Sequence, residues 1–89
     1  MKRLHVYYSG HVHGVGFRYA AVDIARRYGI FGWVKNLRDG RVEVVAEGKD
    51  AAVQSFLDAL NAEMAHHIRD KNVSWETAAS EFTDFRIKF

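Results

Sequence analysis

The stretch LHVYYSGHVHGVGFRYAAVDIARRY (residues 4–28) changes its hydrophobic period halfway along. Before the glycines the apolar residues alternate, and Leu4, Val6 and Tyr8 share one face, which predicts a strand with one buried side. After the glycines the spacing is that of an amphipathic helix, whose apolar face comprises Phe17, Ala20, Ala21, Ile24, Ala25 and Tyr28. Gly29 suits the position just beyond the helix. A strand, a glycine-rich loop and a helix are therefore expected, in that order.

A β-hairpin is expected next, because two β-rich runs flank the turn LRDG (residues 37–40). The pair Asp-Gly is a strong hairpin signal. In the second run Val42, Val44 and Ala46 alternate as a buried face. The outward face of that run comprises Arg41, Glu43 and Glu47.

A second helix is expected after Gly48, with Asp50 as its N-cap. Its apolar face comprises Val53, Phe56, Leu57, Leu60 and Met64. No glycine or proline marks its end, so the sequence leaves the structure of residues 65–72 open. Residues 73–80 predict a weak strand and residues 84–89 a clear one. In that last strand Phe85, Ile87 and Phe89 alternate with Asp84, Arg86 and Lys88.

The element order β-α-β-β-α-β, with a further terminal strand, predicts a single α+β domain over residues 1–89. With right-handed crossovers, both helices cover one face of an antiparallel sheet of four to five strands, the ferredoxin-like split βαβ sandwich. This fold hosts many unrelated activities, so the function has to be inferred from particular residues.

The composition is typical of a packed globular chain: 48% of its 89 residues are hydrophobic and 13% are aromatic. Thirteen Lys and Arg against eleven Asp and Glu give a net charge of +2. That small excess suits small anions and is weak evidence for nucleic acid. The lack of cysteine excludes disulfides and thiolate chemistry. No apolar run approaches the roughly 18 residues of a membrane span, and a cytoplasmic protein is expected.

The loop between the first strand and the first helix has the features of an anion site. Gly10, Gly14 and Gly16 let successive N–H groups turn toward one point, and the helix N-terminus adds free amides and a favourable dipole. Arg18 offers a planar fork of donors that matches phosphate, and no metal is required. The spacing is neither G-x-x-x-x-G-K-[ST] nor G-x-G-x-x-G. A plain tight turn with a solvated Arg18 is the competing interpretation.

Asn36 and two histidines are the other candidate groups. Val34 and Asn36 share a strand face, and the fold can bring Asn36 near the loop, where its amide would contact a water; otherwise it simply enters the turn. His13 has two interpretations, a general base or cation at low pH, and a side chain that points out of the loop. His11 and His13 could share a metal, but no third ligand is evident.

The segments GHVHGVGFR (residues 10–18) and GWVKNLRDGRVEVVAEG (residues 32–48) resemble the two signature segments of the acylphosphatases. The closing FTDFRIKF (residues 82–89) resembles the last strand of that family. By this resemblance Arg18 is the catalytic arginine that holds the substrate phosphate, and Asn36 orients the attacking water. The resemblance also implies a phosphate cradle formed by the backbone amides of His13, Gly14, Val15, Gly16, Phe17 and Arg18. The family commonly has Gln at the position of His13.

The implied activity is hydrolysis of the carboxyl–phosphate bond of acyl phosphates, without a metal or cofactor. This chemistry suits the residues present, because an acyl phosphate releases a carboxylate whose conjugate acid has a pKa of about 4 to 5. No proton donor is then needed, and the site has only to hold the phosphoryl group and place water in line. The expected partner is a small-molecule acyl phosphate, with no nucleic acid and no membrane, and a monomer is expected.

Two other functions remain open from the residues. One is a binding module of the same fold, such as an RNA-binding or regulatory domain, in which Tyr7 would stack on a base. The other is a domain that binds phosphate without turnover, against which the presence of both Arg18 and Asn36 argues.

Overall fold

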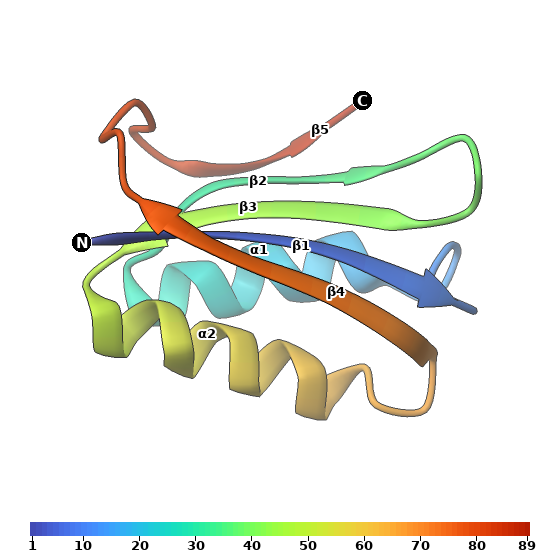
Figure 1. Cartoon of the computed structure of the whole chain (residues 1–89). Helices are drawn as coiled ribbons and strands as arrows, with labels where there is room; N and C mark the ends of the chain where they lie inside the picture. The colour runs from blue at the N-terminus through green and yellow to red at the C-terminus, as the bar shows by residue number, and fades with distance from the viewer.

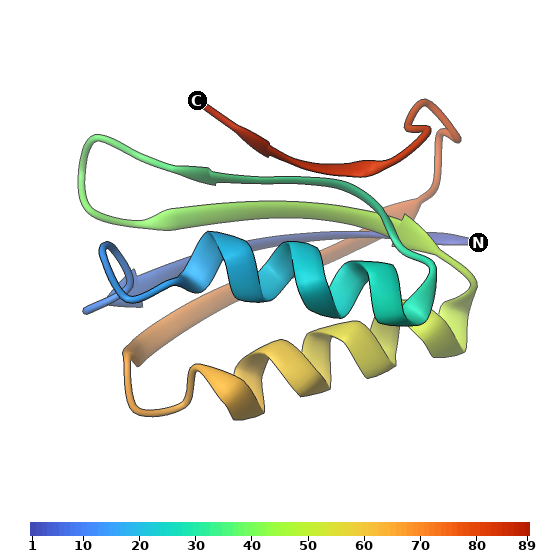
Figure 2. The same ribbon diagram turned by 180° about the vertical axis from the view of Figure 1, so that it is seen from behind.

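The computed structural model describes all of residues 1–89 as a sheet with two helices on one face (Figures 1 and 2). Its elements are β1 (Lys2–Gly10), α1 (Phe17–Tyr28), β2 (Phe31–Asn36), β3 (Val42–Gly48), α2 (Asp50–Glu63), β4 (Ile68–Thr77) and β5 (Phe85–Lys88). The strand order is β4-β1-β3-β2-β5. The ferredoxin-like split βαβ arrangement predicted from the sequence is confirmed.

The strand pairing brings the ends of β1 and β2 to the same edge of the sheet. Both strands run antiparallel to β3 on either side of it, and Val44 lies opposite Val6 on one side and Val34 on the other. β1 and β2 therefore point the same way. The loop that follows β1 and the turn that follows β2 lie at one end of the molecule in both views (Figures 1 and 2).

The fifth strand departs from the antiparallel expectation, which holds for the other four. β5 runs parallel to β2, with Ile87 opposite Val34. The reason lies in β4, which runs antiparallel to β1 and ends with Thr77 beside Lys2. The chain then enters β5 from the end of the sheet where β1 begins, so β5 runs in the same direction as β1 and β2.

The alternation and helical spacing in the sequence correctly predicted most of the core. Leu4, Val6 and Tyr8 are fully buried on the helix-facing side of β1. The helices bury Phe17, Ala21, Ile24, Ala25, Val53, Phe56, Leu57 and Leu60. The ring of Phe17 lies 4.9 Å from the ring of Tyr8, which fixes the start of α1 beneath the end of β1.

Three details of the predicted elements were wrong. Lys49, and not Asp50, is the N-cap of α2, and no side chain there caps the helix. β4 spans Ile68–Thr77 in place of the expected strand at residues 73–80, because an edge strand accommodates polar residues on largely exposed faces. Phe89 does not join the buried face: it follows the last paired residue of β5 and is 94% exposed.

Glu47 lies on the sheet face away from the helices, as the alternation predicted, but it is only 1% exposed, which the sequence did not indicate. It is held there by its hydrogen-bond donors. Its Oε2 atom accepts hydrogen bonds from Arg3 Nε at 2.7 Å and from the Ala79 amide at 2.9 Å. Arg3 also pairs with Glu81. The connection between β4 and β5 is thus fastened to the sheet by the Glu47 carboxylate and by the Arg3–Glu81 pair.

Lowering the pH is expected to weaken the fold through Glu47. Burial would raise the pKa of this carboxyl, but the hydrogen bonds from the Ala79 amide and Arg3 outweigh it, and the pKa lies below its ordinary value of 4.5. The ionised form therefore stabilises the fold fully above about pH 4.5, and this stability is lost as the pH falls from there through the lower pKa of the folded state. Glu47→Gln should lower the free energy of unfolding by about 1–3 kcal/mol at neutral pH.

Urea denaturation of the parent and Glu47→Gln between neutral pH and pH about 3 measures this effect. The parent should lose more stability than the variant over the acid part of that range. Glu63→Gln is the matched control, since Glu63 is exposed and forms no ion pair. Equal acid sensitivity in the parent and Glu47→Gln would contradict the role assigned to this carboxylate.

Candidate active site

The loop between β1 and α1 has an alternating backbone conformation. Gly14 and Gly16 have φ values of 72° and 78°, whereas Val15 between them has a negative φ. A Cβ atom at either glycine would meet no atom within 4 Å, so the backbone conformation, and not crowding, requires glycine here. Alternation of left- and right-handed residues is the backbone pattern that can turn successive N–H groups toward one side, as in an anion-binding nest.

The amides of this loop have no acceptors within the protein. Outside the helices and strands, the His11 amide donates to the His67 carbonyl and the Ala20 amide donates to the Gly16 carbonyl. The amides of residues 12–19, between these two donors, donate to no backbone or side-chain acceptor. The first turn of α1 contains no acidic residue either. The loop and helix N-terminus therefore present a row of free donors with partial positive charge.

Arg18 adds a full positive charge beside these amides. It is the second residue of α1, directly after the buried Phe17, and it is half-buried itself. Its guanidinium takes part in none of the ion pairs of the chain. The guanidinium carbon lies 5.6 Å from the centre of the Phe89 ring. Arg18 thus has an aromatic neighbour but no anionic partner within the protein.

Asn36 lies close to the loop, which is one of the two possibilities that the sequence left open. It ends β2, and together with the loop it lines a hollow of about 260 Å³. The other residues that line this hollow are Val12, Gly14, Gly16, Phe17, Arg18 and Tyr19. The side-chain oxygen of Asn36 is buried and has no hydrogen-bond partner in the protein. A buried acceptor of this kind is costly, which points to a ligand or water as its partner.

The His13 side chain does not point out of the loop into solvent, and its ring forms a hydrogen bond. Its Nε2 atom lies 2.9 Å from the carbonyl oxygen of Arg41, in the turn between β2 and β3. The ring centre of His11 lies 6.3 Å from that of His67. No group of three or more His, Asp or Glu side chains is arranged to hold a metal ion.

Sequence reasoning missed two aromatic residues that border the site. Tyr19 lines the hollow although it is 72% exposed, and Phe89 reaches Arg18 from the end of β5. Tyr19 follows Arg18 in the helix and lies outside its apolar spacing, and no pattern linked Phe89 to residues far away in the chain. The interaction of His13 with the Arg41 carbonyl had no sequence signal.

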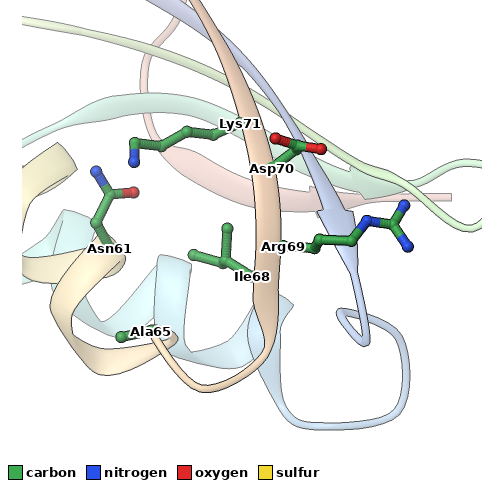
Figure 3. Close-up of a pocket in the computed structure, with 6 residues that line it drawn as sticks. All are labelled: Asn61, Ala65, Ile68, Arg69, Asp70 and Lys71. Atoms are coloured by element: carbon green, nitrogen blue, oxygen red, sulfur yellow. The ribbon is translucent and has the colours of Figure 1, made fainter.

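A second hollow, of about 340 Å³, lies between α2 and β4 and contains none of the predicted site residues. Figure 3 shows Lys71 pointing toward Asn61, with Arg69 and Asp70 directed to the other side of β4. The side-chain oxygen of Asn61 accepts a hydrogen bond of 2.7 Å from the Tyr8 hydroxyl. This hollow has neither a glycine-rich loop nor a free helix N-terminus, so the loop hollow remains the better candidate.

An anion held at the loop hollow would meet backbone donors on one side and Arg18 on another. The hollow lies in an α+β fold with two helices on one face of a five-stranded sheet. The family model described as Acylphosphatase matches residues 4–87. The chain therefore belongs to the acylphosphatase family, whose members are hydrolases that act on acyl phosphates.

Individual relatives agree with this assignment. The chain is 43% identical over 88 residues to the acylphosphatase of Roseiflexus sp. (strain RS-1), covering 98% of this chain and 95% of the relative. It is 42% identical over 89 residues to that of Anaeromyxobacter sp. (strain Fw109-5), covering 99% and 96%. The crystal structure of acylphosphatase from Bacillus subtilis superposes with a TM-score of 0.90 at 34% identity, over the whole of both chains.

The two helices of the structure are too short and too polar to cross a membrane.

Proposed function

We propose that this chain hydrolyses acyl phosphates in the hollow between the glycine-rich loop and Asn36. The observation that carries the proposal is the row of loop amides without acceptors, next to an arginine without an anionic partner. The phosphoryl oxygens would accept hydrogen bonds from the amides of His13, Gly14, Val15, Gly16, Phe17 and Arg18. The Arg18 guanidinium neutralises charge on the equatorial oxygens as the transition state forms.

Asn36 supplies the second function of the site, which is to orient the attacking water. Its buried, unpartnered side-chain oxygen can accept a hydrogen bond from that water and aim it at phosphorus. The water oxygen forms the new bond to phosphorus as the bond from phosphorus to the acyl oxygen breaks. The carboxylate leaves with the electron pair, and the proton lost by the water passes to phosphate and solvent.

The leaving group determines which phosphates this arrangement can hydrolyse. A carboxylate is stable without protonation because its conjugate acid has a pKa of about 4 to 5. An alkoxide, in contrast, needs a proton donor or a cation as it departs. No Asp or Glu lines the hollow, and the His13 ring is directed to the Arg41 carbonyl. The residues therefore support turnover of activated acyl phosphates.

Phosphate release from acetyl phosphate, benzoyl phosphate and glycerol 3-phosphate, measured in EDTA, tests this proposal. Both acyl phosphates should turn over in the presence of the chelator. The alkyl phosphate should react at least about 10⁴-fold more slowly, because general acid catalysis of that size is missing. Comparable rates on all three compounds, or loss of activity in EDTA that added metal restores, would reject this mechanism.

A nucleic-acid-binding function has less support. Tyr7, the candidate for base stacking, already has the Arg41 guanidinium carbon 4.7 Å from its ring centre and the His5 ring 4.9 Å away. Glu43, on the neighbouring strand, places a negative charge close to the same face. We propose a monomer of one domain over residues 1–89 that acts on a small-molecule substrate, without nucleic acid or membrane. Its residence in the cytoplasm stays a prediction.

A further inference from the structure

One backbone carbonyl connects the two halves of the proposed site. The carbonyl oxygen of Arg41 accepts a hydrogen bond of 2.8 Å from the Leu37 amide and lies 2.9 Å from His13 Nε2. Leu37 directly follows Asn36, and His13 directly precedes Gly14 in the loop. A single acceptor therefore links the end of the strand that carries Asn36 to the loop that would hold the phosphoryl group.

This interaction is the sole hydrogen bond between the loop, residues 11–16, and the β2–β3 hairpin. The other attachments of the loop lead elsewhere. The His11 amide bonds to the His67 carbonyl near β4, and the Gly16 carbonyl accepts from Ala20 in α1. Val12 is buried in the core, but an apolar contact has no preferred direction. Only the His13 interaction fixes the loop against the hairpin in a defined geometry.

We propose that His13 is a positioning residue, which sets the distance between the phosphate cradle and Asn36 through the Arg41 carbonyl. This inference rests on the proposed function of the same hollow. A carbonyl oxygen can only accept, so Nε2 of His13 must carry the proton and donate. The side chain then acts on catalysis without touching the substrate.

The chemistry of the donor determines which replacements preserve the interaction. A glutamine side chain also carries an N–H donor several bonds from its backbone, whereas alanine has none. Loss of the interaction leaves the cradle amides and Arg18 in place, because they belong to the loop and the start of α1. The position of these amides and of Arg18 relative to Asn36 becomes less fixed. A misplacement of about 1 Å in a catalytic arrangement can reduce a rate about 10²-fold, and a partial loosening less.

Steady-state kinetics with benzoyl phosphate on the parent, His13→Ala and His13→Gln test the inference. In His13→Ala we expect kcat to fall about 10-fold, with the inhibition constant of inorganic phosphate changed by less than about twofold. His13→Gln should recover most of the lost kcat. The matched control is His11→Ala, in the same loop, whose side chain makes no hydrogen bond to the hairpin, and it should behave like the parent.

A titration with inorganic phosphate followed by NMR gives a readout besides turnover. In the parent, phosphate should shift both the loop amide signals and the side-chain amide signal of Asn36. In His13→Ala the loop signals should still shift, while the shift at Asn36 should be much smaller. An unchanged kcat together with an unchanged Asn36 shift in His13→Ala would overturn the inference. So would an equal loss of kcat in His13→Gln. A parent that neither turns over benzoyl phosphate nor binds phosphate would instead reject the proposed function.

Discussion

Arg18→Ala is expected to lower kcat/KM for benzoyl phosphate by about 10³-fold or more, the range found when an arginine is removed from a phosphoryl-transfer site. The guanidinium is the one charged group that lines the hollow. Negative charge on the phosphoryl oxygens would otherwise meet backbone amides alone. The fold should survive the change, since Arg18 forms no ion pair and is only half-buried.

Two further variants separate charge from geometry at this position. Arg18→Lys keeps the positive charge but lacks the planar fork that binds two phosphate oxygens at once, so only part of the activity should return. Arg26→Ala removes an exposed arginine from the last turn of the same helix and should leave kcat/KM unchanged. Urea denaturation should confirm that all three proteins fold. If Arg18→Ala kept a tenth or more of the parent kcat/KM, the guanidinium would have no catalytic role.

Asn36→Ala is expected to lower kcat by about 10²- to 10³-fold, as for other groups that orient a reacting atom. The inhibition constant of inorganic phosphate should change little, because Asn36 is expected to contact the water and not the phosphoryl oxygens. Stability should stay equal or rise slightly, since the mutation removes a buried oxygen that has no partner in the protein. A loss of activity without a loss of stability is the expected signature of a functional residue.

Lys35→Ala is the matched control for Asn36. Lys35 is the preceding residue of β2 and faces the opposite side of the sheet, so its removal should leave kcat unchanged. Asn36→Asp keeps an acceptor for the water but places a negative charge next to the phosphate, and should therefore weaken phosphate binding. A parent-like kcat in Asn36→Ala would show that another group orients the water.

Local patterns predicted the elements that bury one face. In β1 the alternation of Leu4, Val6 and Tyr8 predicts a strand with one buried face, and in the structure that face packs against the helices. The helical spacing from Phe17 to Tyr28 predicted both ends of α1 correctly. The helix ends there because Gly29, directly after it, adopts a left-handed conformation with φ of 66°. In both segments the sequence contains the hydrophobic period of the element and the glycine at its end.

Long-range contacts explain the misses. Glu47 alternates like a solvent-facing residue, but the connection after β4 folds back and covers it, which depends on residues more than thirty positions away. Phe89 follows the apolar alternation of β5 but lies beyond the last paired residue, so no neighbouring strand covers it. The strand topology, which could be predicted from the sequence, brings Arg18 and Asn36 to one hollow. The hydrogen bond of His13 to the Arg41 carbonyl depends on atomic positions that the sequence does not indicate.

The strand order described above has a consequence for the speed of folding. Lys2 pairs with Gly48 on one side of β1 and with Thr77 on the other, so the central strands close loops that span most of the chain. Proteins rich in such distant pairings fold slowly, on the scale of milliseconds to seconds. The chain contains no proline, so no isomerisation of a prolyl bond adds a slower phase. Because the loop after β1 and Asn36 meet only when both strands have paired with β3, the return of enzymatic activity should mark the end of refolding.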